Sequence, residues 1–349
     1  MATDKQFSTL ERLYILTTDY NLNRSLIFPE TFQAPHLRYL VLWGAVPAVG
    51  FTFTTVMNLV TLGLYNIPPF AYFTPSSLFT RLSLMPQLES LAIAFDAHVV
   101  NREFNNQLSN TPIMSQIALP NLRWFWFRGF STYLDDVFAQ ISAPLLKTLS
   151  INLFAQFTPL AVPHFLQFVS SSENLGFRTV LLGLEAMSFF SRGYQHGEHG
   201  KGSVSSFEIW FASEYCCWPV ASVMQALGAL LPLFSVAEQL TLSCRSHDRS
   251  LPMHNDLGRT QWRGLLRLFS SVNTRYVVAR VSCSLQSEGG EPPLELSPNL
   301  ELLGYSAGGD NDYAAYAFIS FINKRQRAGC AITLSKVDDS LFGCESPWS

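Results

Sequence analysis

The chain has few charged residues, and the two signs nearly balance. Asp, Glu, Lys and Arg make up only 14% of its 349 residues, whereas an average soluble domain holds roughly 25%. The formal net charge is −3, so we expect no long-range attraction to nucleic acid or to anionic lipid. Hydrophobic residues nevertheless reach 48%, a composition that excludes a disordered chain and predicts a large buried core.

Paired cysteines and catalytic motifs are also missing. The six cysteines are scattered and form no C-x-x-C pair, so their spacing predicts neither a disulfide framework nor a zinc site. Reduced thiols are typical of a cytoplasmic or nuclear protein, and the N-terminal residues lack the apolar stretch of a secretory signal. No phosphate-binding loop, nucleophile elbow or dinucleotide fingerprint occurs. We therefore expect no enzyme activity, no catalytic residues and no cofactor.

Two long stretches lack charge and leave open the alternative of a membrane-associated protein. Residues 39–80 and 215–237 contain no Asp, Glu, Lys or Arg, and either is long enough for a spanning helix of about 20 residues. Proline, glycine and asparagine interrupt the first stretch, and prolines also fall in the second. Neither stretch is flanked by the Lys/Arg cluster that orients membrane helices. The favoured interpretation is a protein without membrane association.

An apolar motif, L-x-x-L-x-L with other apolar residues allowed, recurs along the chain. Leucine-rich repeats have periods of ~20–29 residues, and the spacing here lies at the long, irregular end of that range. A final apolar segment at residues 331–334 is expected to close the array. The first positions of the eleven copies are residues 10, 37, 59, 88, 122, 146, 177, 204, 237, 272 and 300.

The alternation within each motif predicts a β-strand. The last two apolar positions are two residues apart, so both face the same side of a strand. Parallel stacking of such strands buries a continuous apolar column, and parallel strands need return connections that are usually helical. Thr74 and Pro75 form a typical helix start, and Pro86 ends that helix. Further helices are expected over residues 132–142, 163–173, 219–231, 260–271 and 313–327.

These patterns predict one α/β solenoid rather than several domains. It would be a leucine-rich-repeat-like horseshoe of about eleven irregular repeats over residues 1–337, with a flexible tail at 338–349. The parallel sheet would line the concave face, and helices and loops would form the convex face. The glycine- and histidine-rich residues 191–203 and residues 284–298 are expected to be exposed loops.

Residues between the apolar positions are expected to face away from the core. When the motif is numbered 1 to 7, positions 3, 5 and 7 lie on the concave face, where neighbouring strands are ~4.8 Å apart. In the first five repeats these positions are rich in aromatic residues and include arginine, both enriched in binding hot spots. The alternative is that a loop or an N-terminal module covers them as ordinary core. The candidate partner-binding residues are Tyr14, Tyr39, Trp43, Tyr65, Trp124, Trp126 and Arg128.

Several segments resemble the repeat region of a known family. APHLRYLVLWG, MPQLESLAI and APLLKTLSI in the N-terminal half, and RTQWRGLLRLFSSV in the C-terminal half, are similar to the leucine-rich-repeat-like region of F-box proteins from agaricomycetes, the mushroom-forming fungi. The resemblance covers about residues 10–337. It implies a solenoid that captures a substrate protein while an F-box docks the Skp-type adaptor of a ubiquitin ligase.

The F-box itself is absent from this chain, because the first repeat begins at residue 10. An adaptor is therefore expected only if an F-box exists upstream. Two interpretations stay open: a truncated gene model of an F-box protein, and a free-standing repeat protein unrelated to ubiquitination. Either way, the expected partner is a protein on the concave face.

Three clusters of potential metal ligands carry weak signals. Surrounding glycines disfavour the helix that the two histidines of the first cluster would need, and no third ligand is evident. The second cluster lacks a fourth ligand, and the third lacks the glycine and glutamate spacing of a calcium loop. We expect exposed loops and no metal, with an enzyme that uses the histidine-containing loops as the alternative. The clusters are His196 and His199; Cys244, His247 and His254; and Asp310, Asn311 and Asp312.

Overall fold

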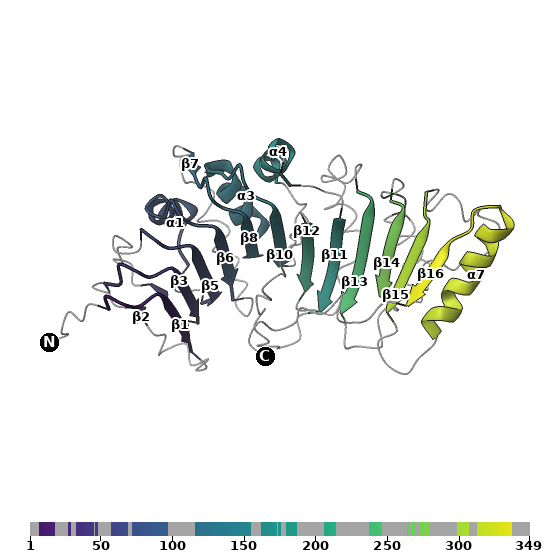
Figure 1. Cartoon of the computed structure of the whole chain (residues 1–349), viewed down its shortest axis with the longest axis horizontal. Coiled ribbons are helices and arrows are strands. Elements are labelled where there is room, and N and C mark those ends of the chain that lie inside the picture. The colour runs from purple at the N-terminus through teal and green to yellow at the C-terminus, as the bar shows by residue number, and fades with distance from the viewer. Residues whose placement is uncertain are drawn as a thin grey trace. The chain divides into compact units, whose positions relative to one another are not determined.

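The computed structural model of the chain divides into two compact units, which are described separately. Unit 1 comprises Met1–Phe154 and Ala161–Leu175, and unit 2 comprises Ala155–Leu160 and Gly176–Ser349. Figure 1 shows their elements in chain order by colour. The structure describes residues 7–17, 27–28, 33–44, 46–47, 57–68, 72–96, 116–154, 162–172, 174–175, 179–186, 206–213, 237–245, 264, 267, 269, 272–278, 299–306 and 313–336.

Six strands form the main sheet in the described part of unit 1. Each neighbouring pair is parallel, and the strands follow one another in chain order. Each strand coincides with one of the first six motif copies, which confirms the strands predicted there. They are β1 (Arg12–Leu16), β3 (Tyr39–Trp43), β5 (Thr61–Ile67), β6 (Ser90–Phe95), β8 (Trp124–Gly129) and β10 (Thr148–Phe154).

Two short parallel ladders accompany this sheet. In the first, β2 (Ile27–Phe28) pairs with β4 (Val46–Pro47). In the second, β7 (Ile117–Ala118) pairs with β9 (Ile141–Ser142). These ladders precede the motif copies and add a second, two-residue strand to some of the repeats.

The alternation in each motif decides which side chains form the core. In β3, Leu40 and Leu42 are fully buried, whereas the other three residues of the strand are half-buried. β1 is the exception, because its Leu13 and Ile15 are only half-buried at the end of the sheet. The equivalent buried residues of the other strands are Leu62, Leu64, Leu91, Ile93, Phe125, Phe127, Leu149 and Ile151.

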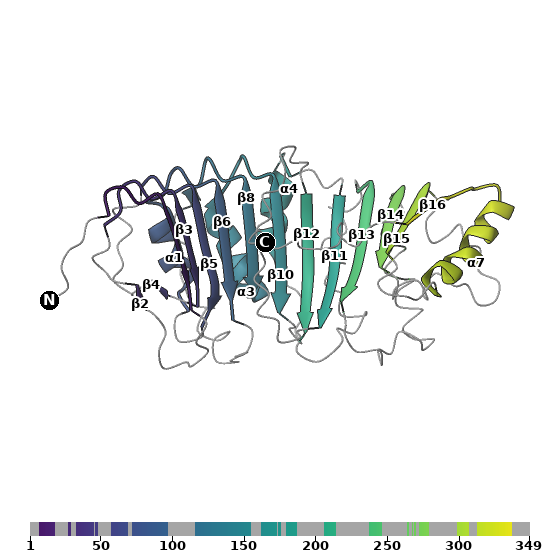
Figure 2. The same ribbon diagram turned by 60° about the horizontal axis from the view of Figure 1, so that its bottom comes forward.

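Three helices in the described part of unit 1 cover the buried side of its sheet. They are α1 (Pro75–Leu82), α3 (Ser131–Gln140) and α4 (Pro163–Ser171), and they lie on one side of the strands in Figure 1. In the view of Figure 2, α1 and α3 lie behind the strands. Aromatic rings join the two layers: Tyr133 of α3 lies 4.8 Å from Phe95, centroid to centroid.

The helix boundaries follow from local signals. The Thr74 side chain accepts a hydrogen bond from the Ser77 amide at the start of α1, and Pro75 occupies the first turn. The helices expected at 132–142 and 163–173 are confirmed, each ending two residues earlier than predicted. A proline in the first turn marks the start of α1 and of α4, whereas α3 begins without a proline or a capping side chain.

The same backbone hydrogen bonds recur from one repeat to the next. The carbonyl at motif position 2 accepts the amides of positions 2 and 3 of the following copy, as Glu11 accepts from Arg38 and Tyr39. The pattern recurs at Arg38, Val60, Glu89 and Arg123 in unit 1, and at Glu238 and Asn273 in unit 2. Both units are therefore built by repetition of one backbone arrangement.

An asparagine also links successive repeats at three places in unit 1. Each donates a side-chain hydrogen bond to a proline carbonyl at the turn of the preceding repeat, with nitrogen–oxygen distances of 2.6–3.0 Å. The bonds hold the turns in a fixed spacing. The pairs are Asn58 with Pro35, Asn121 with Pro86, and Asn174 with Pro144.

Six described strands form the sheet of unit 2, but they do not follow the chain order. β11 pairs with β12 on one side and with β13 on the other. A sequential array would place β12 between the other two, so the expected stacking is wrong at this point. The strands are β11 (Thr179–Ala186), β12 (Ser206–Ser213), β13 (Gln239–Arg245), β14 (Thr274–Val278), β15 (Leu302–Ser306) and β16 (Thr333–Lys336).

The last described helix, α7 (Tyr313–Arg327), has the bounds predicted from the sequence. It lies beside β15 and β16 in Figures 1 and 2. Its last turn carries three basic residues, which favour a helix C-terminus, and Gly329 follows with a φ of 79°. The helix expected at 219–231 and most of the one at 260–271 lie outside the described residues.

The described residues form a mixed α/β structure with mostly parallel strands and four helices. Residues 39–80, a stretch without charge, contain β3, β5 and most of α1. No helix in the described ranges has the length and apolar character needed to cross a membrane. The single solenoid over residues 1–337 stays a prediction, and the loops at 191–203 and 284–298 and the tail at 338–349 lie outside the described residues.

Candidate functional site

The outward face of unit 1 is the side of its sheet that carries motif positions 3, 5 and 7. The register of the strands aligns these positions in three rows, so all seven candidate residues lie on this one face. A register shift between Leu64 and Ile67 interrupts the third row. The rows are Arg12, Tyr39, Thr61, Ser90, Trp124 and Thr148; Tyr14, Val41, Gly63, Ala92, Trp126 and Ser150; and Leu16, Trp43, Tyr65, Ala94, Arg128 and Asn152.

Three of the candidates contact one another. Trp43 stacks on Tyr65 with a centroid distance of 5.4 Å and an interplanar angle of 19°. Tyr65 in turn contacts Trp126 at 5.5 Å, although β6 lies between their strands. The contact forms because β6 presents only the small side chains of Ala92 and Ala94 near the middle of this face. These three rings form an aromatic ladder across four strands.

Gly63 also makes room for the aromatic ladder. A Cβ atom at this position would lie 2.6 Å from a ring carbon of Tyr65, well inside van der Waals contact. The Tyr65 ring therefore lies directly over the glycine. Any larger residue at position 63 would push the ring away from its two partners.

Burial divides the seven candidates into two groups. Tyr65 and Trp126 expose only 6% and 5% of their surface, and burial raises the pKa of Tyr65 well above its usual value. Tyr14, in contrast, is 40% exposed. Tyr65 and Trp126 are therefore almost fully buried within the outward face, whereas the other five candidates expose part of their side chains to solvent. The half-buried candidates are Tyr39, Trp43, Trp124 and Arg128.

The most exposed part of the outward face is its N-terminal end. On β1, Leu16 exposes 67% of its surface beside Tyr14. The guanidinium carbon of Arg12 lies 4.6 Å from the ring centroid of Tyr39, a cation–π contact that orients both side chains. We call Arg12, Tyr14, Leu16, Tyr39 and Trp43 the N-terminal patch. Arg12 and Leu16 occupy outward positions of the first motif copy but were not among the candidate partner-binding residues.

The opposite end of the outward face is buried and polar. Asn152 on β10 is only 1% exposed, and among the described residues neither polar atom of its side chain has a hydrogen-bond partner. Ser150 in the next row is also buried. Arg128 places its guanidinium carbon 5.8 Å from the Phe154 ring centroid. On the outward face of unit 1, the accessible apolar surface is therefore concentrated in the N-terminal patch.

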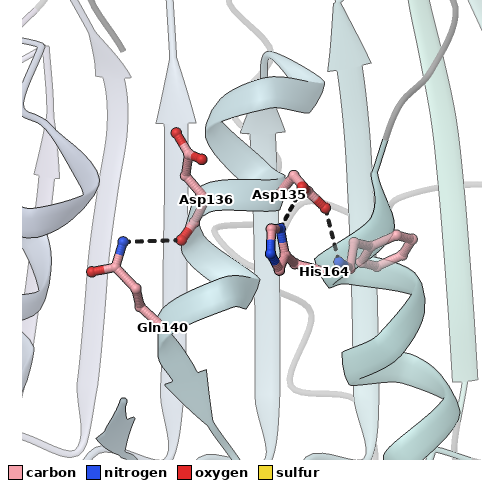
Figure 3. Close-up of polar contacts among 5 residues, drawn as sticks. Asp135, Asp136, Gln140 and His164 are labelled. Carbon is pink, nitrogen blue, oxygen red and sulfur yellow. Dashed lines mark hydrogen bonds and ion pairs between the residues drawn. The ribbon is translucent and has the colours of Figure 1, made fainter. Parts of the chain in front are cut away.

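On the helix side of unit 1, one carboxylate joins two helices. Figure 3 shows Asp135 of α3 beside His164 of α4. The backbone amide of Phe165, like His164, belongs to the first turn of α4. Oδ1 accepts a hydrogen bond from Phe165 N–H at 2.9 Å, and Oδ2 lies 2.9 Å from Nδ1 of His164. The N-cap residue Val162 has no side chain that can cap the helix. Asp135 therefore caps α4 from the neighbouring helix.

This Asp–His pair was missed by the sequence analysis. Its two residues are 29 positions apart on different helices, and no local motif links them. The one indirect signal is the proline-initiated α4, which has no Ser, Thr, Asp or Asn at its N-cap. An Asp–His pair orients the imidazole in some catalytic sites. In the described part of the chain, however, the bond to Asp135 is the only hydrogen bond of the His164 side chain, which favours a structural role.

Two further ionisable groups lie on α3, the half-buried carboxylate of Asp136 and the buried hydroxyl of Tyr133. The pKa of Asp136 is raised, first by burial and then by the charge of Asp135, although His164 opposes the shift. Gln140 donates its side-chain amide to the Asp136 carbonyl at 3.3 Å (Figure 3). Tyr133 is fully buried, and its hydroxyl has no hydrogen-bond partner in the part of the chain that the structure describes. Burial therefore disfavours the ionised forms of both Asp136 and Tyr133.

The predicted metal-ligand clusters fall mostly outside the described residues. His196, His199, His247, His254 and residues 310–312 lie outside them, and only the backbone of Cys244, in β13, is described. Among the residues that the structure does describe, no three His, Cys, Asp or Glu side chains are grouped so that they could hold a metal ion.

Comparisons with models of protein families, with curated proteins and with solved structures find no match to this chain.

Proposed function

We propose that this chain is a protein-interaction module and that its N-terminal patch contacts the partner protein. The observation that carries the proposal is the exposure of Tyr14 and Leu16 beside the half-buried Trp43 on one face. Aromatic residues and arginine are enriched in binding hot spots, and contiguous exposed apolar patches mark interaction sites. A partner that covers this patch removes its apolar surface from water.

The aromatic ladder prepares this patch for binding. Because Trp43 stacks on Tyr65, and Tyr65 is buried against Trp126, the indole ring is already held in one orientation. The contact between Arg12 and Tyr39 restricts a second pair of side chains. Side chains that are ordered before binding lose less conformational entropy when a partner arrives, which favours affinity.

The finer architecture that we propose is a leucine-rich-repeat-like solenoid with the outward face on its concave side. The recurring position 2 carbonyl bonds and the asparagine–proline links support it, because both repeat from one motif copy to the next. Repeats of this kind bury their apolar faces only against their neighbours. The exchange of β11 and β12 is then a local departure from a sequential array.

A role as the substrate receptor of a ubiquitin ligase is the form of this function that the resemblance to F-box proteins implies. Its support is the similarity of the motifs quoted above, and it requires a Skp-type adaptor and an F-box upstream of residue 10. A free-standing repeat protein, unrelated to ubiquitination, would use the same patch. Reading the genomic sequence upstream of Met1 for an in-frame F-box distinguishes the two.

A double substitution in β1 tests the interaction directly. Tyr14→Thr with Leu16→Thr removes the exposed apolar surface and introduces β-branched residues, which favour a strand. Met57→Thr is the matched control, because Met57 is 58% exposed but lies outside the patch. Each protein is immobilised, and the proteins it retains from its source cells are quantified by mass spectrometry. We expect the native chain and the control to retain the same partner, and the double variant to lose it; equal retention by all three would contradict the proposal.

A further inference from the structure

A cavity of about 520 Å³ lies on the helix side of unit 1, beside the short strand β9. Ile141, Ser142 and Ala143 line one wall, and His164 and Ser171 of α4 line another. Its volume falls in the range of ~300–1,000 Å³ that is typical of ligand sites. It is separate from the N-terminal patch, which lies on the outward face of the same unit.

One edge of β9 is open beside this cavity. β9 pairs with β7 on its other edge, where the Ser142 carbonyl accepts the amide of Leu119. In a parallel strand the backbone groups of successive residues point to opposite sides, so those of Ile141 and Ala143 point away from β7. The Ala143 carbonyl already accepts the Leu146 amide. Within the described part of the chain, the Ile141 carbonyl and the Ala143 amide therefore remain for a further strand.

The cavity lies between β9 and α4, the helix whose end stands where the repeat would place the next strand of this ladder. β7 and β9 each run into a turn closed by an i to i+3 hydrogen bond, from Leu122 to Leu119 and from Leu146 to Ala143. The next turn, from Leu175 to Ser172, closes in the same way. The residue before that turn ends helix α4 instead of forming a strand. Among the described residues the ladder therefore stops at β9, with space beside it.

The chemistry of the walls favours an uncharged ligand. Among the described residues that line the cavity none is Asp, Glu, Lys or Arg, and the polar ones are glutamine, serine, asparagine and His164. Buried Phe138 and Phe168 supply an apolar wall, with ring centroids 4.5 Å apart. A charged side chain placed here would lose hydration without gaining a partner of opposite charge. A neutral peptide backbone with small or apolar side chains would not carry this desolvation cost.

We propose that this cavity binds a short, extended and uncharged peptide segment of a partner protein, as a third parallel strand beside β9. One residue of the segment donates its backbone amide to the Ile141 carbonyl, and the carbonyl of the same residue accepts a hydrogen bond from the Ala143 amide. β9 itself bonds to β7 in this manner, and strand addition to an open edge is a common mode of peptide recognition. Side chains of the segment contact Phe138 and Phe168.

The probe that tests this proposal is a capped peptide with the sequence of β9 itself, acetyl-Gln-Ile-Ser-Ala-Pro-amide, which corresponds to residues 140–144. It is uncharged, and in the chain the same sequence already forms the required parallel pairing. The control peptide carries an N-methyl group on its serine, which removes the donor to Ile141. Binding is followed by the amide resonances of the full-length chain labelled with [15N]alanine, because Ala139 and Ala143 both line the cavity.

We expect the peptide to shift the Ala143 resonance, and N-methylation to weaken binding about tenfold, the effect of one lost hydrogen bond in a shielded site. Ser171→Trp should fill the cavity and abolish the shift, whereas Ser170→Trp, on the exposed neighbour that does not line the cavity, should leave it unchanged. The peptide pair tests the proposal on the native chain even if a variant fails to fold. An unshifted Ala143 resonance at saturating peptide, or equal binding of the two peptides, would overturn the proposal.

Discussion

Replacing Asp135 with alanine should loosen the contact between α3 and α4. The carboxylate accepts the Phe165 amide and contacts His164, and Asp135 itself is 8% exposed. Loss of a helix cap costs about 1 kcal/mol, and loss of a hydrogen bond to a charged group costs about 1.5–3 kcal/mol. Because the two effects overlap at the Phe165 amide, we expect Asp135→Ala to lower the free energy of unfolding by about 2–3 kcal/mol.

Two further variants separate the cap from the charge. Asp135→Asn keeps an oxygen that accepts the Phe165 amide, so we expect it to cost only about 1 kcal/mol. Asp136→Ala is the matched control, because this neighbouring carboxylate is half-buried on the same helix and does not cap α4. Urea unfolding followed by circular dichroism gives the free energies, and amide hydrogen exchange over residues 163–171 locates the loss. A cost for Asp135→Ala no larger than that of the control, or unchanged exchange in α4, would refute the capping role.

Three other substitutions test the buried groups of unit 1. Tyr133→Phe removes a buried hydroxyl that has no partner among the described residues and should raise the free energy of unfolding by about 1 kcal/mol; a loss of stability in urea unfolding would show that the hydroxyl is bonded. Burial and the charge of Asp135 raise the pKa of Asp136, so its ionisation opposes folding; Asp136→Asn should stabilise the chain at pH 7, and the gain should vanish below the unfolded-state pKa of about 3.9. An unchanged gain at pH 3 would contradict this. Gly63→Ala should displace the Tyr65 ring, cost about 1–3 kcal/mol and reduce the near-ultraviolet circular dichroism of the aromatic ladder, whereas an unaltered spectrum would argue against the close contact.

Strand positions were predictable from the sequence because they depend on local pattern. Leu40 and Leu42 are two residues apart and buried, and the intervening positions face outward, as the alternation requires. The start of α1 was predictable for the same reason, since the capping bond of Thr74 reaches only three residues along the chain. Such signals need no knowledge of distant neighbours.

Features that depend on contacts between distant residues were not predictable. The burial of Tyr65 and Trp126 depends on the small side chains of β6, which lies between their strands. The position of β11 between β12 and β13 was missed because the apolar pattern of a strand does not specify which neighbours it pairs with. The capping of α4 by Asp135 similarly depends on how two helices pack.

Site-specific photocrosslinking tests most directly whether the N-terminal patch contacts a protein partner. A benzophenone amino acid replaces Tyr14 in the patch, and in a second protein it replaces Thr80, an exposed residue on α1. We expect a crosslinked partner from position 14, its loss when Leu16→Thr is added, and no crosslink to that partner from position 80. Crosslinks to the same partner from position 80 but not from position 14 would contradict the assignment of the patch.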